Sequence, residues 1–304
     1  MQPFKVRILG CGSALPTLKH FPSSQLVEVR DKVFMVDCGE GTQIQLRKAK
    51  VHFNKVQAVF ISHLHGDHCF GLIGLISTFG MLGRTAPLSV YAPKELESML
   101  KQQMDFFCSG LEYEVTFHGV NASENNVVYE DRSVIVTSIP LNHRIACCGY
   151  KFMEKPTLPH IRRDMIDFYN IPECYRNNIK SGDDWTTPEG VVIPNCRLTL
   201  PADRPRSYAY CSDTKFIPGL YRLVRDVDLL YHEATYSSEN ENRATLYYHS
   251  TARQAATVAL KANARKLVIG HFSARYNDEK VLLDEARSIF PNSFLAEEMA
   301  VFDV

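Results

Sequence analysis

Four potential metal ligands lie within the six-residue segment 63–68, HLHGDH, which directly follows the apolar run 56–62. Side chains two residues apart in an extended chain point to the same side, so His63 and His65 can share one ion. Asp67 and His68 follow in a turn and can face a second point nearby. Imidazole nitrogens and a carboxylate suit Zn²⁺, and Mn²⁺ and Fe²⁺ accept the same donors. The segment therefore predicts a site for two metal ions.

Further potential ligands stand at the ends of other apolar runs, namely His143, Asp213, His232, Glu233 and His271. If these runs are strands that end at a common edge, side chains far apart in the sequence converge in one cleft.

We expect two sets of ligands from this convergence: His63, His65 and His143 for one ion, and Asp67, His68 and His271 for the other, with Asp213 between them. Such a site leaves coordination positions open for a bridging water or hydroxide. An open position is typical of a catalytic metal rather than a structural one, and it indicates hydrolysis.

The composition is that of a globular protein. Of the 304 residues, 45% are hydrophobic and 22% are charged, which excludes a disordered chain. Lys plus Arg equals Asp plus Glu, at 34 each, so any contact with nucleic acid must come from a local patch. We find no membrane span or signal core, and the nine cysteines form no CxxC motif, so we expect a cytoplasmic protein with reduced thiols.

The hydrophobic pattern predicts strands interleaved with helices. Segment 70–83 predicts a buried helix, 93–107 an amphipathic one, and 250–264 a helix opened by a Ser/Thr cap. Strands are predicted at 6–9, 24–29, 32–37 and 56–62, and again around 115, 136, 209, 230 and 268. The region at about 153–206 is rich in proline and lacks periodicity, so we interpret it as an irregular insertion, either an arm that binds a partner or a loop packed on the body.

The motifs resemble those of the metallo-β-lactamase superfamily and, within it, the ribonuclease Z family. The resemblance rests on ILGCGSALPT, VDCGEGTQIQL, HLHGDHCFGL, SDT, HEATY, YHSTARQAA and IGHFSARY, which follow one another over nearly the whole chain. It implies an α+β, αββα four-layer sandwich of two mixed sheets flanked by helices, as a single domain over residues 1–304. It also implies a zinc-dependent endoribonuclease that cleaves precursor tRNA at the 3′ side, and a homodimer in which one subunit grips the tRNA for the other.

In that reaction Asp67 would orient the attacking hydroxide, which bridges the two metals, and take its proton. The resemblance makes His249 the proton donor to the departing 3′-oxygen. Glu233 would orient His249, or else merely support the backbone or a metal-ligating histidine. Asp37 and His232 are interpreted as structural. The same interpretation applies to four further histidines, His20, His52, His118 and His160. We expect the cysteines to be packing residues.

Two departures from the family pattern bear on the substrate. The loop at 16–22, PTLKHFP, lacks the arginine that family members carry there, and the insertion has no Gly-Pro step. Phosphate contacts could still come from Lys and Arg at 151, 155, 162, 163, 176 and 180. These departures keep open a phosphodiesterase or esterase that acts on a small substrate. A third alternative is a non-catalytic module that binds nucleic acid or protein and uses metal only to fold.

Overall fold

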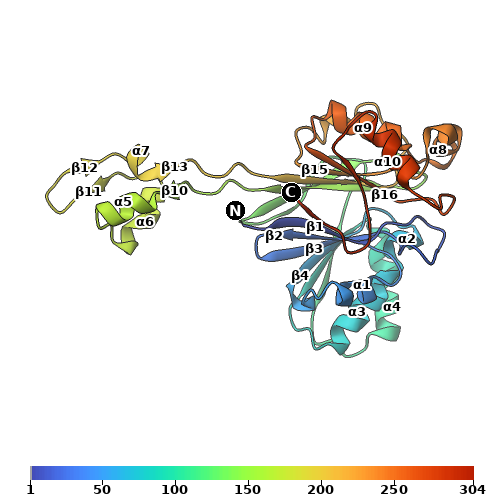
Figure 1. Cartoon of the computed structure of the whole chain (residues 1–304). Helices are drawn as coiled ribbons and strands as arrows, with labels where there is room; N and C mark the ends of the chain where they lie inside the picture. Colours follow the sequence, from blue (N-terminus) through green and yellow to red (C-terminus); the bar gives the residue numbers. More distant parts are fainter. Residues whose placement is uncertain (1) are drawn as a thin grey trace. The chain divides into compact units, whose positions relative to one another are not determined.

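The computed structural model describes residues 2–304, and the chain divides into two compact units. The larger unit comprises Gln2–Met153 and Arg206–Val304, and the smaller one comprises Glu154–Pro205. The larger unit contains two seven-stranded sheets that pack face to face, with helices on the outside of each (Figure 1). This arrangement confirms the predicted four-layer sandwich of two mixed sheets.

The first sheet is antiparallel at one side and parallel at the other. Its strand order is β18-β1-β2-β3-β4-β5-β6, with antiparallel pairing as far as β3 and parallel pairing from β3 onwards. The strands are β1 (Phe4–Gly10), β2 (Ser24–Val29), β3 (Lys32–Cys38), β4 (Val56–Phe60), β5 (Leu88–Ala92), β6 (Val115–Gly119) and β18 (Val301–Asp303).

The second sheet is also mixed, in the order β17-β16-β15-β14-β9-β8-β7. Four neighbouring strands, β17 to β14, run parallel, and β9 joins them antiparallel. The strands are β7 (Val127–Glu130), β8 (Val134–Pro140), β9 (Cys148–Glu154), β14 (Ser207–Cys211), β15 (Leu229–Glu233), β16 (Lys266–Gly270) and β17 (Ser293–Leu295).

Helices α1, α3 and α4 lie outside the first sheet, and α9 and α10 lie outside the second (Figure 1). The α-helices of this unit are α1 (Thr42–Lys48), α2 (Gly66–Cys69), α3 (Gly71–Met81), α4 (Glu95–Phe107), α8 (Glu241–Tyr247), α9 (Ala252–Lys261) and α10 (Lys280–Arg287), and short 3₁₀ turns occur at Phe53–Lys55, Leu220–Arg222 and Ser238–Asn240. The predicted cap of α9 is present. The Thr251 hydroxyl accepts a hydrogen bond from Gln254 N, and the Gln254 side chain accepts one from Thr251 N. Across residues 2–304, no helix is long and apolar enough to cross a membrane.

Helix α3 is less buried than its sequence predicts. Leu72 and Phe79 are buried against the first sheet, whereas Met81 is exposed at 78%. An apolar sequence on all sides therefore does not mean a helix buried on all sides, because one face here is left uncovered by the rest of the unit.

Aromatic side chains fill the space between the two sheets and hold the strand ends in place. Phe60 of β4 stacks on Tyr91 of β5 at 4.8 Å and meets Phe152 of β9 edge-on at 5.4 Å. Burying one such side chain contributes about 1.5–3 kcal/mol. The Tyr150 hydroxyl donates a 2.7 Å hydrogen bond across the interface to the carbonyl of Ile61. The backbone just before the HLHGDH segment is thereby fixed to the opposite sheet.

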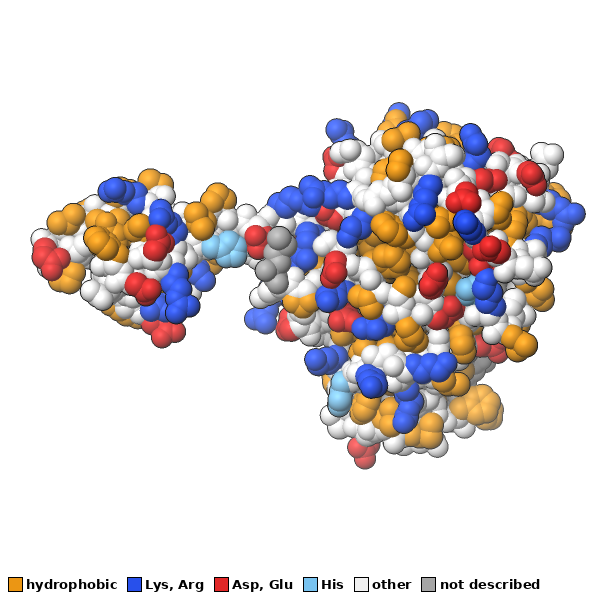
Figure 2. All heavy atoms as spheres, in the orientation of Figure 1, with side chains coloured by type: hydrophobic (Ala, Val, Ile, Leu, Met, Phe, Trp, Pro, Cys, Tyr) orange, Lys and Arg blue, Asp and Glu red, His pale blue; other side chains and the backbone are white. Residues whose placement is uncertain are grey.

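We expected an irregular insertion here, but the smaller unit contains short regular elements and a core of its own. Its elements are β10 (His160–Ile161), α5 (Arg163–Phe168), α6 (Glu173–Lys180), β11 (Trp185–Thr186), β12 (Val192–Ile193), α7 (Asn195–Leu198) and β13 (Thr199–Leu200). Its core is formed by Ile171, Ile179, Trp185, Ile193 and Leu198. Helices of four to eight residues are too short for hydrophobic periodicity to reveal them. On the face shown in Figure 2, basic and acidic side chains are interspersed over both units.

Candidate metal centre

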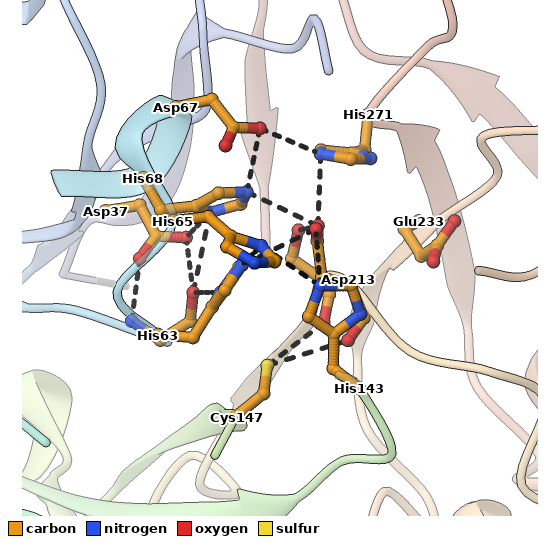
Figure 3. Close-up of polar contacts among 12 residues, drawn as sticks. Asp37, His63, His65, Asp67, His68, His143, Cys147, Asp213, Glu233 and His271 are labelled. Atoms are coloured by element: carbon orange, nitrogen blue, oxygen red, sulfur yellow. Dashed lines mark hydrogen bonds and ion pairs between the residues drawn. The ribbon is translucent and has the colours of Figure 1, made fainter. Parts of the chain in front are cut away.

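All seven predicted ligands lie together at the ends of strands in the larger unit (Figure 3). His63 and His65 follow β4, and Asp67 and His68 lie in the short helix α2. The other three ligands follow three strands of the second sheet: His143 after β8, Asp213 after β14 and His271 after β16. The folding of the sheets is what brings side chains separated by some two hundred residues into one site.

Three histidines form the first part of the centre. His65 Nδ1 lies 3.0 Å from His63 Nε2 and 3.1 Å from His143 Nε2. Asp213 Oδ2 lies 3.5 Å from His63 Nε2 and 3.7 Å from His143 Nε2. These four donor atoms surround a single point, as the ligands of one cation do.

The second part of the centre lies on the other side of Asp213. Asp67 Oδ2 is 3.4 Å from both His68 Nε2 and His271 Nε2. Asp213 Oδ1 is 3.3 Å from His68 Nε2 and 3.1 Å from His271 Nε2. The two oxygens of Asp213 therefore face the two parts of the centre, which is the arrangement expected of a bridging ligand.

The outer nitrogens of the histidines are held by other groups, which fixes the direction of the inner ones. His68 Nδ1 bonds Asp37 Oδ2 at 2.7 Å, His271 Nδ1 bonds Thr235 Oγ1 at 2.9 Å, and His143 Nδ1 bonds the Tyr248 carbonyl at 3.1 Å. Such outer partners are characteristic of metal-ligating histidines. His68 Nε2 is buried and faces the carboxylate oxygens of Asp67 and Asp213 at 3.4 and 3.3 Å, so a cation among these three atoms would be coordinated by all of them. The donor set thus fits divalent cations.

Asp37 is one of these outer partners rather than a ligand. Its carboxylate accepts from Ser62 N at 2.7 Å, from Ser62 Oγ at 2.9 Å and from the Tyr210 hydroxyl at 2.6 Å, besides its bond to His68. It is completely buried, and a buried carboxylate is tolerated when it is satisfied in this way. This agrees with the structural role predicted for it.

The backbone around Asp37 touches the backbone of the ligand loop. A β-carbon on Gly71 would lie 2.0 Å from the carbonyl oxygen of Gly39, and one on Gly39 would lie 2.5 Å from the carbonyl oxygen of Asp67. Only glycine allows two chain segments to approach so closely. The two sequence motifs that carry these glycines, VDCGEGT and HLHGDHCFG, are therefore in direct main-chain contact.

Four residues of the site have left-handed backbone conformations: Asp37 with φ of 57°, Asp213 with 42°, His271 with 61° and Tyr248 with 61°. Such conformations cost on the order of 1–3 kcal/mol each for residues other than glycine, and they cluster at functional sites. In the last three they turn the two ligands and the Tyr248 carbonyl into the centre at the points where strands and α8 end.

The carboxylates of the centre are held in their charged form. Burial opposes ionisation, but His68 and His271 outweigh it and keep the pKa of Asp67 well below its usual range. The pKa of Asp213 is likewise well below normal despite burial, because His271, His68 and His63 surround it. Both groups are therefore available as anionic ligands or hydrogen-bond acceptors throughout the neutral pH range.

His249 and Glu233 form a hydrogen-bonded pair beside the candidate ligands. His249 Nδ1 lies 2.9 Å from Glu233 Oε1, and its ring lies 5.3 Å from that of His271. Burial disfavours the charged imidazole, but the charge and hydrogen bond of Glu233 prevail and raise the pKa of His249 to about 9. Burial would raise the pKa of Glu233, yet His249 holds it below normal. An imidazolium donor is therefore present near neutral pH.

A cavity of about 420 Å³ opens over the centre. Besides ligands and His249, its lining includes Arg144 and Tyr247, whose guanidinium and ring are in cation–π contact at 5.2 Å. A basic and an aromatic side chain beside a cluster that fits divalent cations suit a substrate with a phosphate and a base or another planar group.

Some participants were not predicted from the sequence. The Thr235 hydroxyl donates to Glu233 Oε2 at 2.6 Å and also contacts His271 Nδ1. It therefore connects the His249–Glu233 pair with the candidate ligand His271. The Tyr248 carbonyl is a backbone group with no sequence signature, whereas Thr235 lies within HEATY and that motif could have revealed it. His232 lies outside the centre, within β15, where it is buried and bonds the Glu233 carbonyl through Nδ1 at 2.8 Å.

Comparisons with known proteins agree with this geometry. A family model described as Anti-Pycsar protein Apyc1 matches residues 4–143. Among solved structures, the metallo-beta-lactamase fold protein YhfI of Bacillus subtilis superposes with a TM-score of 0.69 over 100% of both chains at 17% identity. The human tRNase Z short form gives a TM-score of 0.71 over 98% of both chains at 24% identity. These likenesses show that the chain has the fold of the metallo-β-lactamase class.

The family within this class follows from sequence identity. Ribonuclease Z of Bacteroides fragilis is 58% identical over 298 residues, which are 98% of each chain. The chain belongs to the ribonuclease Z family.

Proposed function

We propose that this protein is a metal-dependent endoribonuclease that cleaves precursor tRNA at the 3′ side. The observation that carries the proposal is the convergence of seven ligands, with Asp213 facing both halves of the centre, in a chain 58% identical to a protein named Ribonuclease Z. The open cavity above the ligands distinguishes the centre from a purely structural metal site.

We propose two zinc ions for the centre, held by His63, His65 and His143 on one side and by Asp67, His68 and His271 on the other, with Asp213 shared between them. Zinc suits a donor set of imidazoles and carboxylates, and manganese and iron accept the same donors. Bound cations would supply the Lewis acidity that lowers the pKa of water to about 7 and that neutralises charge at phosphorus.

Asp67 has the position and charge to orient the attacking water. Its Oδ2 lies between His68 and His271, and its low pKa keeps it ready to accept a hydrogen bond. A carboxylate fixed between two histidines directs the oxygen of water toward the phosphate and receives the proton it gives up.

His249 would donate the proton that the departing oxygen needs. As the bond between phosphorus and the 3′-oxygen breaks, the electron pair stays on that oxygen, which takes the proton to become the 3′-hydroxyl. Glu233 is a positioning residue for this step, because it bonds His249 and is itself held by Thr214 N at 3.0 Å and Thr235. Its negative charge keeps His249 protonated until the proton is transferred.

We further propose that the chain acts as a single functional domain, with residues 153–206 as an arm for the tRNA, and as a homodimer in the cytoplasm. The arm carries exposed cations such as Arg163, but acidic residues are interspersed, and Arg162 is paired with Asp164 at 2.6 Å. Binding would then depend on a few individual phosphate contacts rather than on a broad basic surface. Light scattering of the purified protein tests the dimer.

Cleavage of a precursor tRNA with its product ends mapped tests the proposal. We expect a cut at the 3′ side that leaves a 3′-hydroxyl on the tRNA and that requires zinc or manganese. Loss of cleavage in His63→Ala, with an unchanged fold by circular dichroism, would assign the activity to this centre. Hydrolysis of a small phosphodiester without any cleavage of RNA would favour the small-substrate alternative instead.

A further inference from the structure

A second group of potential metal ligands lies outside the catalytic centre, at Cys11, His20 and Glu298. The three residues come from the end of β1, from the loop that follows it and from the segment before β18. Their ligand atoms lie within 4.8 Å of one another. The sequence predicts packing roles for Cys11 and His20, whose neighbouring stretches offer no donor partners. Glu298 is far from both along the chain, and only the fold brings it to them.

Two of the three distances within this group fall in the range of a coordination shell, and the third is slightly shorter. Cys11 Sγ lies 3.3 Å from His20 Nδ1 and 3.6 Å from Glu298 Oε1, and His20 Nδ1 lies 3.0 Å from Glu298 Oε2. Ligands about 2.0–2.3 Å from a tetrahedral zinc ion lie roughly 3.3–3.6 Å from each other. The shorter separation of 3.0 Å also occurs in the catalytic centre, between His63 Nε2 and His65 Nδ1.

The groups around these ligands are those that metal sites require. His20 Nε2 bonds Glu279 Oε1 at 3.2 Å, which leaves Nδ1 for an ion and reproduces the carboxylate–histidine arrangement of zinc sites. Glu279 is in turn paired with Lys19. Glu298 Oε1 accepts from Phe21 N at 3.0 Å, which fixes the carboxylate. A thiolate, a neutral imidazole and a carboxylate would balance the charge of one divalent cation.

We propose that Cys11, His20 and Glu298 bind a zinc ion that is separate from the catalytic centre and that joins the loop after β1 to the C-terminal segment. Cys11 is fully buried, and the side chains of His20 and Glu298 are only 11% and 18% exposed, so the site is nearly closed. A thiolate ligand selects zinc over the harder divalent ions. The fourth position would be taken by water.

The ion would fix the loop that borders the catalytic cavity. The Cys11 carbonyl accepts from Phe272 N at 2.9 Å and Ser13 N donates to the Phe272 carbonyl at 3.1 Å, next to the ligand His271. Ser13 and Ala14 line the cavity. A metal that joins residues 11 and 20 to the C-terminal segment therefore secures one wall of the active site.

Cobalt substitution tests this site directly, because the catalytic ligands are all nitrogen and oxygen. Thiolate-to-cobalt charge transfer in the near-ultraviolet can arise only where a cysteine binds the ion. We expect the band in the cobalt-loaded wild-type protein and its loss in Cys11→Ser. Cys108→Ser, a buried cysteine elsewhere, should keep it.

Metal analysis provides an independent measurement. Wild-type protein should contain one ion more per chain than Cys11→Ser or His20→Ala, whatever the catalytic centre holds. In hydrogen-exchange measurements, the amides of residues 12–20 should exchange faster in the two variants than in the wild type. Absence of the thiolate band in fully loaded wild type, or its persistence in Cys11→Ser, would overturn the proposal and leave His20 as an imidazolium between two carboxylates. Neither outcome depends on RNA cleavage, so the proposed function is tested separately.

Discussion

The imidazole of His249 and the carboxylate of Glu233 are joined by a 2.9 Å hydrogen bond from Nδ1 to Oε1, and the carboxylate is entirely buried. Glu233 has three further partners in Thr214 N, Thr235 N and Thr235 Oγ1. The carboxylate cannot turn away from the histidine without losing several of these bonds. The pair is therefore preorganised as a proton donor and its support.

Replacing Glu233 with glutamine should move the alkaline limb of the pH profile. The charge of Glu233 raises the pKa of His249 to about 9, so without that charge the pKa falls toward the ordinary value of about 6.5. His249 must be protonated to donate, and activity is lost as the pH rises through its pKa. The limb of kcat should consequently shift to lower pH. Glu297→Gln, at an exposed position, is the control and should leave the alkaline limb where it is. An unchanged limb in Glu233→Gln would contradict this role of Glu233.

The variant His249→Ala should lose activity only on substrates with a poor leaving group. We expect kcat on precursor tRNA to fall about 10²- to 10⁴-fold, the usual contribution of general acid catalysis. A p-nitrophenyl phosphodiester should be hydrolysed almost normally, because its leaving group needs no proton. Unchanged metal content would show that the centre is intact. Equal losses on both substrates would instead make His249 a ligand or a structural residue.

The variant Asp37→Asn should weaken metal binding without removing a ligand. His68 Nδ1 donates to Asp37, and loss of such an outer carboxylate typically costs 10- to 100-fold in metal affinity. Competition with a chelator measures the change. Tyr210→Phe removes one bond to the same carboxylate and leaves its charge, so its effect should be much smaller. Similar affinities in the two variants would contradict this role of Asp37.

Binding of precursor tRNA should weaken with salt, and the arm should account for part of that dependence. Each phosphate contact made by a cation contributes about one unit to the slope of log K against log salt. Arg163→Ala and Lys180→Ala should each flatten the slope if the residue touches phosphate. Asp167→Ala, an acidic neighbour on α5, should not flatten it. Binding that is insensitive to salt would exclude these contacts.

The small core of residues 154–205 should unfold without the rest of the chain. Ile179 is 1% exposed and belongs to a five-residue buried cluster, so Ile179→Ala should cost about 2–5 kcal/mol, more than so small a core can sustain. Limited proteolysis should then cut within this segment, while hydrolysis of a small phosphodiester by the larger unit continues. Val192→Ala, at an exposed position, serves as the control. If protease resistance of residues 154–205 and hydrolysis by the larger unit were lost together, the two units would fold cooperatively.

The candidate ligands that lie together and the main sheets could be read from the sequence because both leave strong local patterns. HLHGDH places four donors within six residues, and His143, Asp213 and His271 each follow an apolar run that becomes a strand. Period-two burial and the capping residues of α9 are also local. Where the signal lies within ten or twenty residues, physical reasoning from the sequence sufficed.

What the sequence did not predict depends on contacts between distant segments. The bond between His143 and the Tyr248 carbonyl joins residues 105 positions apart, and the group around Cys11 joins positions 11, 20 and 298. Neither has a spacing that could be recognised in advance. The short helices of the smaller unit were missed for the opposite reason, since each is too brief to show a period.

The close approach of Gly39 and Gly71 determines how the centre responds to change. Side chains in contact can adopt new rotamers to absorb a small displacement, but two main chains that touch have no such freedom. We therefore expect a shift of β3 to be passed on to Asp37 and to the segment that carries His68. Mutations far out in the first sheet can for this reason alter catalysis while leaving every ligand in the sequence unchanged, and directed evolution of the enzyme would find such positions productive.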